Sequence, residues 1–288
     1  MKKELTTNAY AKINLYLHVT GTRDDGYHLI ESVMQSVSLA DEITVTADTD
    51  ARGKRIGSSC SDERIPLDGN NIAVKCAAAF FEHFGIDNYS LDIRIDKKIP
   101  ISGGLAGGST DGAAVLKLLD KIYETDAGDD KLCSLGAKIG ADIPFCVIGG
   151  TALCEGIGEK VTPLYIPSPQ YSVLIVSPGG GVSTPDAYRA IDEYGDITAK
   201  YPISEVVTEL VGGTLPRSLH NDFETVILPA NDSATLVKQK LVDLGAFAAQ
   251  MSGSGPTVFG LFESEKKCGI AAEKLEEIGF SAFVCRAI

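Results

Sequence analysis

A glycine-rich segment at residues 100–111 has the residue types of an anion-binding site. Four of the six residues from Gly103 to Gly108 are glycines, and Ser109, Thr110 and Asp111 come directly before an apolar run with helical character. Glycine lets a backbone approach a ligand closely, and Ser, Thr and Asp are typical helix caps. The first turn of a helix adds amide donors and the positive end of the helix dipole. The segment therefore predicts an anion site, most plausibly for phosphate.

Two familiar phosphate loops are excluded by the spacing. The Walker pattern requires Gly-Lys-Ser/Thr at the helix start, whereas Gly108 is followed directly by Ser109. The dinucleotide fingerprint requires G-x-G-x-x-G, and the four glycines at 103, 104, 107 and 108 do not have that spacing. Locally, the segment fits either a third type of phosphate loop or a plain tight turn.

Two charged side chains elsewhere could take part in such chemistry. Residues 10–20 alternate apolar and polar side chains as a strand does, and Lys12 shares the polar face with Asn14 and His18. Because such a face usually meets solvent, the pattern alone favours a surface lysine. Asp142 stands among apolar neighbours, where an aspartate either caps a helix or turn or serves as a functional carboxylate.

Periodicity and turn residues predict the elements that must position these side chains. Residues 49–70 are polar and rich in Gly and Ser, so we expect an irregular loop there. Two prolines within residues 165–171 suggest a domain boundary. A second glycine-rich turn is expected at 252–256. The expected strands are 10–20, 41–46, 91–96, 171–176, 247–251, 257–262 and 281–287, and the main expected helices are 71–84, 113–123, 129–138 and 264–277. This mixture indicates an α+β protein of two domains.

Composition limits the possible functions. The 288 residues carry a formal net charge of −13, which disfavours nonspecific binding to nucleic acid or to an anionic membrane. The seven cysteines form no C-x-x-C pair, and the four histidines show no metal-ligand spacing, so we expect reduced thiols and no protein metal site. We find no signal peptide and no membrane span, and we therefore expect a cytoplasmic protein.

Several motifs in one order resemble the GHMP kinases, the family named for galactokinase, homoserine kinase, mevalonate kinase and phosphomevalonate kinase. Residues 100–110 match the central phosphate loop of the family, and residues 251–257 match its C-terminal glycine motif. One branch of the family is matched best, by the segments at 11–15, 25–28, 140–145, 156–159 and 220–224. The departures are small. Thr110 stands where a serine is usual, and Gly112 stands where an alanine is usual, which lowers helix stability by up to about 1 kcal/mol.

The resemblance implies a two-domain GHMP kinase fold and a reaction. It implies an N-terminal mixed α/β nucleotide domain at 1–165 and a C-terminal ferredoxin-like α+β domain at 166–288. The implied reaction moves the γ-phosphoryl group of ATP, with Mg²⁺, to the 2-hydroxyl group of a cytidylylated methylerythritol in isoprenoid precursor synthesis. Lys12 and Asp142 are then the catalytic residues: Asp142 accepts the hydroxyl proton or orients the hydroxyl, and Lys12 keeps Asp142 ionised and stabilises the transferring group.

The resemblance also implies the binding residues. The acceptor would meet Asn14, which strand alternation places on the Lys12 face, and the cytidine would meet Tyr27, His28 and Tyr188. Tyr188 is explained equally well as a core tyrosine. Lys97 and Lys98 are explained equally well as a pair of charged side chains in solvent. The residues expected to bind ATP are Pro100, Ile101, Ser102, Gly103, Gly104, Leu105, Ala106, Gly107, Gly108, Ser109, Thr110, Asn71 and Lys97.

Two other functions stay open at this point. A mevalonate- or homoserine-type kinase of the same family shares the glycine loop, but it has no use for the cytidine segment at 25–28. A catalytically silent nucleotide-binding regulator has no use for both Lys12 and Asp142. The expected partners are ATP and a small-molecule acceptor, with no nucleic acid or membrane, and the chain is expected to be a monomer or a homodimer.

Overall fold

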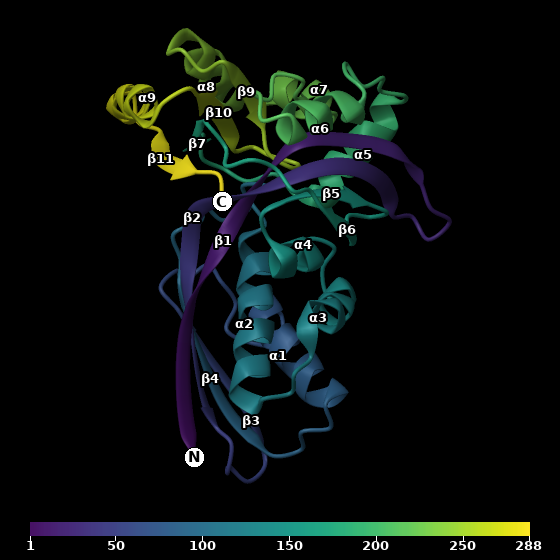
Figure 1. Cartoon of the computed structure of the whole chain (residues 1–288), viewed down its shortest axis with the longest axis vertical. Coiled ribbons are helices and arrows are strands. Elements are labelled where there is room, and N and C mark those ends of the chain that lie inside the picture. Colours follow the sequence, from purple (N-terminus) through teal and green to yellow (C-terminus); the bar gives the residue numbers. More distant parts are fainter. The chain divides into compact units, whose positions relative to one another are not determined.

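The computed structural model describes residues 1–288, which form two compact units (Figure 1). The first unit combines Met1–Ala11, Ala40–Ile99 and Ala106–Ile148, and the second combines Lys12–Leu39, Pro100–Leu105 and Gly149–Ile288. Two long strands, β1 (Lys2–Thr22) and β2 (His28–Asp48), therefore contribute to both units. The expected boundary between residues 165 and 166 stays a prediction.

The first unit is a sheet with helices on one face (Figure 1). Its strands follow the order β3-β4-β2-β1; β4 is antiparallel to β2 and parallel to β3. Alternation along β4 buries Leu91, Ile93 and Ile95 against α1 and α2, which form one core with the sheet. The further elements of this unit are β3 (Lys54–Cys60), β4 (Tyr89–Asp96), α1 (Ile72–His83), α2 (Gly107–Tyr123), α3 (Gly128–Ala137) and α4 (Ile143–Ile148).

The expectation of an irregular loop over residues 49–70 was wrong in part. Lys54–Cys60 forms the edge strand β3, which pairs in parallel with β4 from Lys54↔Tyr89 to Cys60↔Ile95. An edge strand has only one neighbour and can remain polar, so β3 lacks the apolar alternation that marks a strand in sequence.

The second unit contains a four-stranded antiparallel sheet in the order β11-β7-β10-β9. It also contains β5 and β6, which extend β2 as an antiparallel hairpin, and the short β8, which pairs in parallel with β1. Its elements are β5 (Thr151–Glu155), β6 (Lys160–Pro163), β7 (Ser172–Ser177), α5 (Thr184–Tyr194), α6 (Ile203–Val211), β8 (His220–Asn221), α7 (Phe223–Ile227), the 3₁₀ turn Leu228–Ala230, α8 (Asp232–Asp243), β9 (Ala248–Met251), β10 (Val258–Phe262), α9 (Glu265–Glu277) and β11 (Ser281–Arg286).

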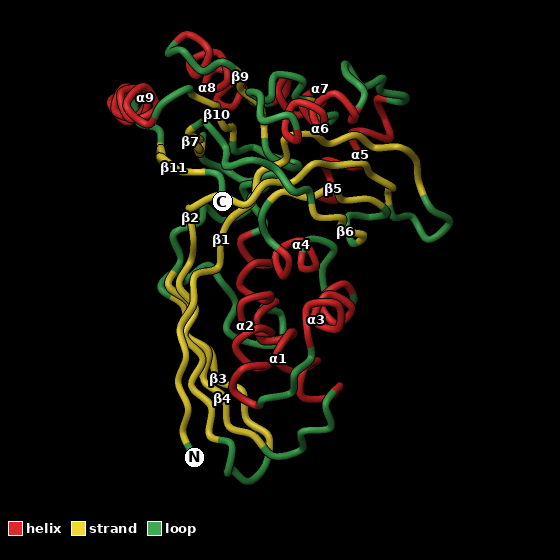
Figure 2. Tube along the Cα trace, in the orientation of Figure 1, coloured by secondary structure: helices red, strands yellow, loops and turns green.

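Helices α8 and α9 lie beside this sheet (Figure 2). They bury their apolar sides against its strands. Val237 and Leu241 of α8 and Leu275 of α9 are fully buried, together with Leu174 and Phe262 of the strands. Ser264 caps α9 by accepting a hydrogen bond from the Lys267 N–H, as expected for a serine at that position. The predicted α+β class is thereby confirmed.

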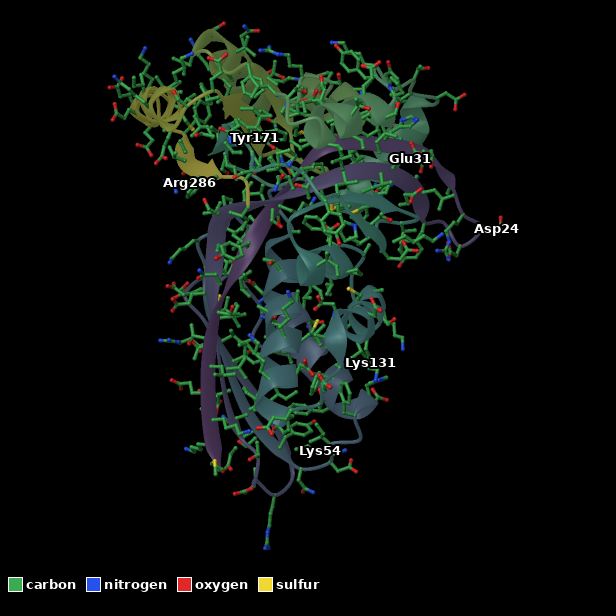
Figure 3. The ribbon with its side chains drawn as sticks, viewed as in Figure 1. Asp24, Glu31, Lys54, Lys131, Tyr171 and Arg286 are labelled. Carbon is green, nitrogen blue, oxygen red and sulfur yellow. The ribbon has the colours of Figure 1, made fainter.

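The segment between β1 and β2 is a solvent-exposed loop of the second unit. Figure 3 shows Asp24 at its tip, and the loop is closed by a 2.7 Å hydrogen bond from Arg23 N–H to the carbonyl oxygen of Tyr27. Elsewhere in the chain, none of the seven cysteines forms a disulfide, and four of them are buried. None of the helices combines the length and the apolar character needed to cross a bilayer.

Candidate functional site

The first half of the glycine loop, residues 100–105, belongs to the second unit and has a strained backbone. Ser102 has a φ of 54° and Gly104 a φ of 77°, both in the left-handed region. The carbonyl oxygen of Gly104 accepts a 3.0 Å hydrogen bond from Ser252 Oγ, and that of Leu105 accepts one of 3.2 Å from Lys12 N–H. A loop whose carbonyls are bound in this way can turn its N–H groups toward a ligand.

The second glycine-rich turn packs directly against this half of the loop. Gly253 and Gly255 have φ values of 55° and 79°, and the Ser252 N–H closes the turn on the Thr257 carbonyl oxygen at 2.9 Å. A Cβ added at Gly253 would lie 3.0 Å from the Gly104 carbonyl oxygen. Ser252 and Gly104, which the hydrogen bond joins, are 148 residues apart in the sequence. Both motifs need glycine because their backbones are in close contact.

Thr257 is a polar residue of this region that the sequence did not single out. Its hydroxyl oxygen is fully buried and has no hydrogen-bond partner within the protein. A Cβ at Gly103 would lie only 2.5 Å from that oxygen, so the hydroxyl faces the glycine loop. A buried hydroxyl normally finds a partner, and Thr257 is therefore suited to an atom of a bound ligand or an ordered water.

Lys12 is buried, and the expectation of a surface lysine was wrong. Only 4% of the residue is exposed, because this part of β1 is covered on both faces. Its ammonium group donates a 2.7 Å hydrogen bond to Asn14 Oδ1, and Asn14 Nδ2 donates to Ser32 Oγ at 2.9 Å. A Cβ at Gly253 would lie 3.4 Å from Lys12 Nζ, which places the cation beside the second glycine turn. The structure thus brings Lys12, Asn14 and both glycine motifs together.

The second half of the glycine loop starts helix α2 in the first unit. Ala106 precedes the helix with a φ of 58° and makes no side-chain cap, and α2 begins at Gly107. The expected capping role of Ser109, Thr110 and Asp111 was therefore wrong, because these residues lie inside the helix, after its first two residues. A helix start without a side-chain cap keeps its first amide donors available to an anion.

Lys97 is held in a buried ion cluster rather than a solvated charge pair. Its ammonium group binds Asp41 Oδ2 and, at 3.0 Å, Asp111 Oδ2, and all three side chains are at most 5% exposed. Asp41 also accepts hydrogen bonds from the backbone N–H groups of Lys98 and Ile99. Lys97 Nζ would lie 3.2 Å from a Cβ at Gly107, so the cluster sits directly beside the start of α2.

The two carboxylates of this cluster share one cation. Burial raises the pKa of Asp111 to about 7; Lys97 opposes this rise and the negative charge of Asp41 adds to it. The pKa of Lys97 is also raised, since the two carboxylates outweigh the effect of its burial. Asp41 was not singled out in the sequence, and Asp111 was singled out only as a helix cap.

Asn71 and Asp142 each stand at the start of a helix in the first unit. Asn71 caps α1: its Oδ1 accepts from Ala73 N–H at 2.8 Å, and its Nδ2 donates to the Pro66 carbonyl oxygen at 2.8 Å. Asp142 precedes α4, and its carbonyl oxygen accepts from Cys146 N–H at 3.0 Å. Asp142 is half-buried, and both the cap and the carboxylate roles remain compatible with that position.

Two of the three cytidine candidates contact each other in the second unit. The rings of His28 and Tyr188 are stacked with centroids 4.4 Å apart and planes 18° apart, and Tyr188 also packs edge-on against Phe223. His28 Nε2 is hydrogen-bonded to Asp192 at 2.7 Å, a partner that the sequence did not suggest. Tyr27 lies on the exposed loop between β1 and β2, with 59% of its surface accessible. A hollow of about 450 Å³ adjoins His28 and Asp192.

The fold agrees with the comparisons with known proteins. Residues 71–150 match the GHMP kinases N terminal domain, and residues 208–279 match the GHMP kinases C terminal domain. The chain belongs to the GHMP kinase family. The predicted two-domain GHMP kinase fold is confirmed.

Relatives named for one substrate match the chain over its full length. It is 40% identical to a 4-diphosphocytidyl-2-C-methyl-D-erythritol kinase of Clostridium botulinum, covering 97% of this chain and 99% of the relative. It is 38% identical to the kinase of the same name from Clostridium beijerinckii, with the same coverage. A crystal structure of 4-(cytidine 5'-diphospho)-2C-methyl-D-erythritol kinase superimposes with a TM-score of 0.81 at 31% identity, covering 98% of both chains.

Proposed function

We propose that this chain transfers the γ-phosphoryl group of ATP to the 2-hydroxyl group of 4-diphosphocytidyl-2-C-methyl-D-erythritol, within the non-mevalonate route to isoprenoid precursors. The observation that carries this function is the full-length identity of about 40% to kinases named for that acceptor. Solved homoserine and mevalonate kinases match at 21% and 17% identity, which supports a common fold alone.

Phosphoryl transfer depends on positioning and on charge stabilisation more than on covalent chemistry. The glycine loop supplies backbone N–H groups from its left-handed residues and from the uncapped start of α2. These donors suit the phosphates of ATP, whose Mg²⁺ complex brings part of the neutralising charge with it. The side chains of Asn71 and Lys97 are already bonded to Ala73 and Asp111, respectively. In this proposal they stabilise the backbone around the nucleotide site.

Lys12 and Asp142 have separate chemical roles in this proposal. The ammonium group of Lys12 stabilises negative charge on the transferring phosphoryl group, and its burial strengthens that effect. The carboxylate of Asp142 orients the acceptor hydroxyl and takes its proton as the bond to phosphorus forms. Asn14 holds the Lys12 ammonium group by a 2.7 Å hydrogen bond and contacts the acceptor.

Aromatic side chains select the cytidine. Tyr27 and Tyr188 offer ring surfaces to the cytosine, and His28 offers a polar edge that can read it. The stacked His28–Tyr188 pair supports this assignment because it presents a rigid aromatic surface beside a hollow. A mevalonate- or homoserine-type acceptor has no base to bind such a surface. A cytoplasmic location and a monomer or homodimer complete the proposal.

An acceptor panel tests this function. The chain is incubated with ATP and Mg²⁺, and ADP release is followed separately with cytidylylated methylerythritol, mevalonate and homoserine. Turnover confined to the cytidylylated acceptor is expected. Turnover with mevalonate or homoserine alone would overturn the assigned substrate, and ATP binding without turnover on any acceptor would favour a silent regulator.

A further inference from the structure

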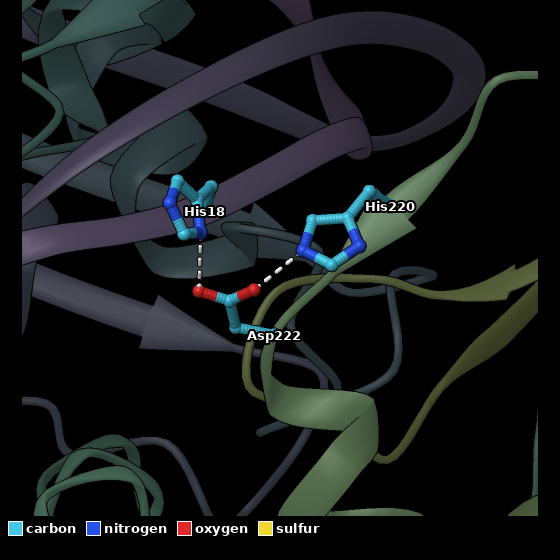
Figure 4. A group of neighbouring side chains, drawn as sticks. All are labelled: His18, His220 and Asp222. Atoms are coloured by element: carbon cyan, nitrogen blue, oxygen red, sulfur yellow. Dashed lines mark hydrogen bonds and ion pairs between the residues drawn. The ribbon is translucent and has the colours of Figure 1, made fainter. Parts of the chain in front are cut away.

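Three side chains with metal-ligating atoms meet in the second unit (Figure 4). His18 Nδ1 lies 2.8 Å from Asp222 Oδ2, and His220 Nε2 lies 2.5 Å from Asp222 Oδ1. The parallel pairing of β1 with β8 creates this arrangement: Tyr16 pairs with His220 and Leu17 with Asn221, so His18 comes beside Asp222. The Asp222 N–H also donates to the Leu17 carbonyl oxygen at 3.0 Å.

The carboxylate at the centre of this cluster is held rigidly. The Asp222 side chain has no exposed surface, and its Oδ2 accepts a 2.7 Å hydrogen bond from Val19 N–H. It makes no side-chain cap for α7, although it precedes that helix. Each of its two oxygens therefore points at an imidazole, and the backbone bond fixes that orientation as a supporting shell fixes a metal ligand.

We propose that His18, His220 and Asp222 bind a divalent transition-metal ion of the zinc class. Two imidazole nitrogens and one carboxylate oxygen are a ligand set of zinc rather than of Mg²⁺ or Ca²⁺, which take mainly oxygen ligands. The three ligand atoms lie within 4.8 Å of one another. Bonds of about 2.0–2.2 Å in a tetrahedral arrangement put ligand atoms roughly 3.4 Å apart, so the hydrogen-bonded nitrogen and oxygen atoms would separate on binding and any wider spacing would close.

Both imidazoles can present a lone pair to the ion. The ion takes the place of the hydrogens that now lie between the rings and the carboxylate, so each neutral ring carries its proton on the other nitrogen. For His18 that nitrogen is Nε2. For His220 it is Nδ1, which at present accepts only a long 3.5 Å hydrogen bond from Lys200 N–H. Losing that bond removes little stabilising energy.

The fourth position of a tetrahedral ion is open to solvent. His18 and Asp222 line the hollow of about 450 Å³ that also contains His28 and Asp192. His220 lines a neighbouring hollow of about 320 Å³. An ion between them can enter from either hollow and can hold a water as its fourth ligand, as in zinc sites with three protein ligands.

A zinc titration of the full chain tests the proposal. The protein is treated with a chelator, dialysed without nucleotide, and titrated with Zn²⁺ in a calorimeter. One ion per chain is expected, and His18→Gln should weaken its binding by at least about tenfold. His83→Gln on the exposed face of α1 removes a histidine outside the cluster and should leave the affinity unchanged. His220→Gln provides a second test if His18→Gln unfolds.

Cobalt provides a readout that needs no variant. Co²⁺ in the wild-type site should give the intense visible absorption of a tetrahedral ion with nitrogen and oxygen ligands. A sulfur-to-cobalt charge-transfer band would instead place the ion on the cysteines and overturn the proposal. Equal zinc affinity in wild type, His18→Gln and His220→Gln, or no saturable binding to the wild type, would also overturn it.

Discussion

Replacing Gly104 with alanine tests how tightly the two glycine motifs of the second unit fit together. The added Cβ would overlap the carbonyl oxygen of Ser252, and it would lie 3.0 Å from the carbonyl carbon and 3.1 Å from Gly255 N. All three atoms belong to the backbone, so no side-chain rotation can relieve the overlap. Gly104 also has a φ of 77°, which an L-residue adopts at a cost of about 1–2 kcal/mol.

Gly179→Ala is the matched control. Gly179 has a φ of 80° in the same unit, and a Cβ there would meet nothing within 4 Å. Gly179→Ala therefore lowers the free energy of unfolding only through backbone strain. Gly104→Ala lowers it by a further amount of about 1–3 kcal/mol through overpacking, a typical cost. The difference in unfolding free energy between the two variants, measured by urea denaturation, should fall in that range.

The same variant should impair the reaction. A shift of the loop by about 1 Å can lower the rate by roughly 100-fold, because the phosphates are positioned by the backbone. Steady-state assays should show a large loss of kcat/KM for ATP in Gly104→Ala and a normal value in Gly179→Ala. Equal stability of the two variants together with normal kcat/KM in both would refute the close packing and the role of the loop.

Three further variants test separate parts of the account. Asp142→Asn should lower kcat by at least about 100-fold while ATP binding, measured by calorimetry, stays nearly intact; near-normal turnover would remove the carboxylate from the reaction. Tyr27→Ala should raise KM for the cytidylylated acceptor several-fold and change stability by less than about 0.5 kcal/mol, since the side chain is exposed; an effect on ATP alone would move Tyr27 out of the acceptor site. Burial raises the pKa of Asp111 to about 7 from 3.8, so the native state holds the Asp111 proton more tightly than the unfolded state does. The contribution of this proton to the free energy of unfolding is therefore full below pH 4 and is lost as the pH rises to 7. It amounts to at most about 4 kcal/mol, and Asp111→Asn should flatten the pH dependence of urea unfolding between pH 4 and 7; an unchanged slope would contradict the ion cluster.

Local patterns predicted most of the regular elements. The helix expected at 71–84 is α1 at Ile72–His83, and the strand expected at 91–96 lies within β4. Alternation identified the strand around Lys12 but could not say how many of its faces are covered, because burial depends on what packs against the strand. The burial of Lys12 and Asn14 therefore emerged only from the fold.

Contacts between distant segments could not be predicted from spacing. Lys97 reaches Asp41 across 56 residues, and His18 reaches Asp222 across 204 residues, through the pairing of β1 with β8. The four histidines have no ligand spacing in the sequence, yet two of them meet at one carboxylate. Such clusters depend on strand register, which a single sequence leaves undetermined.

The central claim is that this chain phosphorylates one acceptor at one hydroxyl group. Its most direct test is a single reaction with ATP, Mg²⁺ and equal amounts of cytidylylated methylerythritol, mevalonate and homoserine, analysed by mass spectrometry and by proton–phosphorus correlation NMR. We predict one product, the cytidylylated methylerythritol carrying a new phosphate on its 2-hydroxyl group. A phosphate on mevalonate, on homoserine or on another hydroxyl group of the cytidylylated acceptor would contradict the claim.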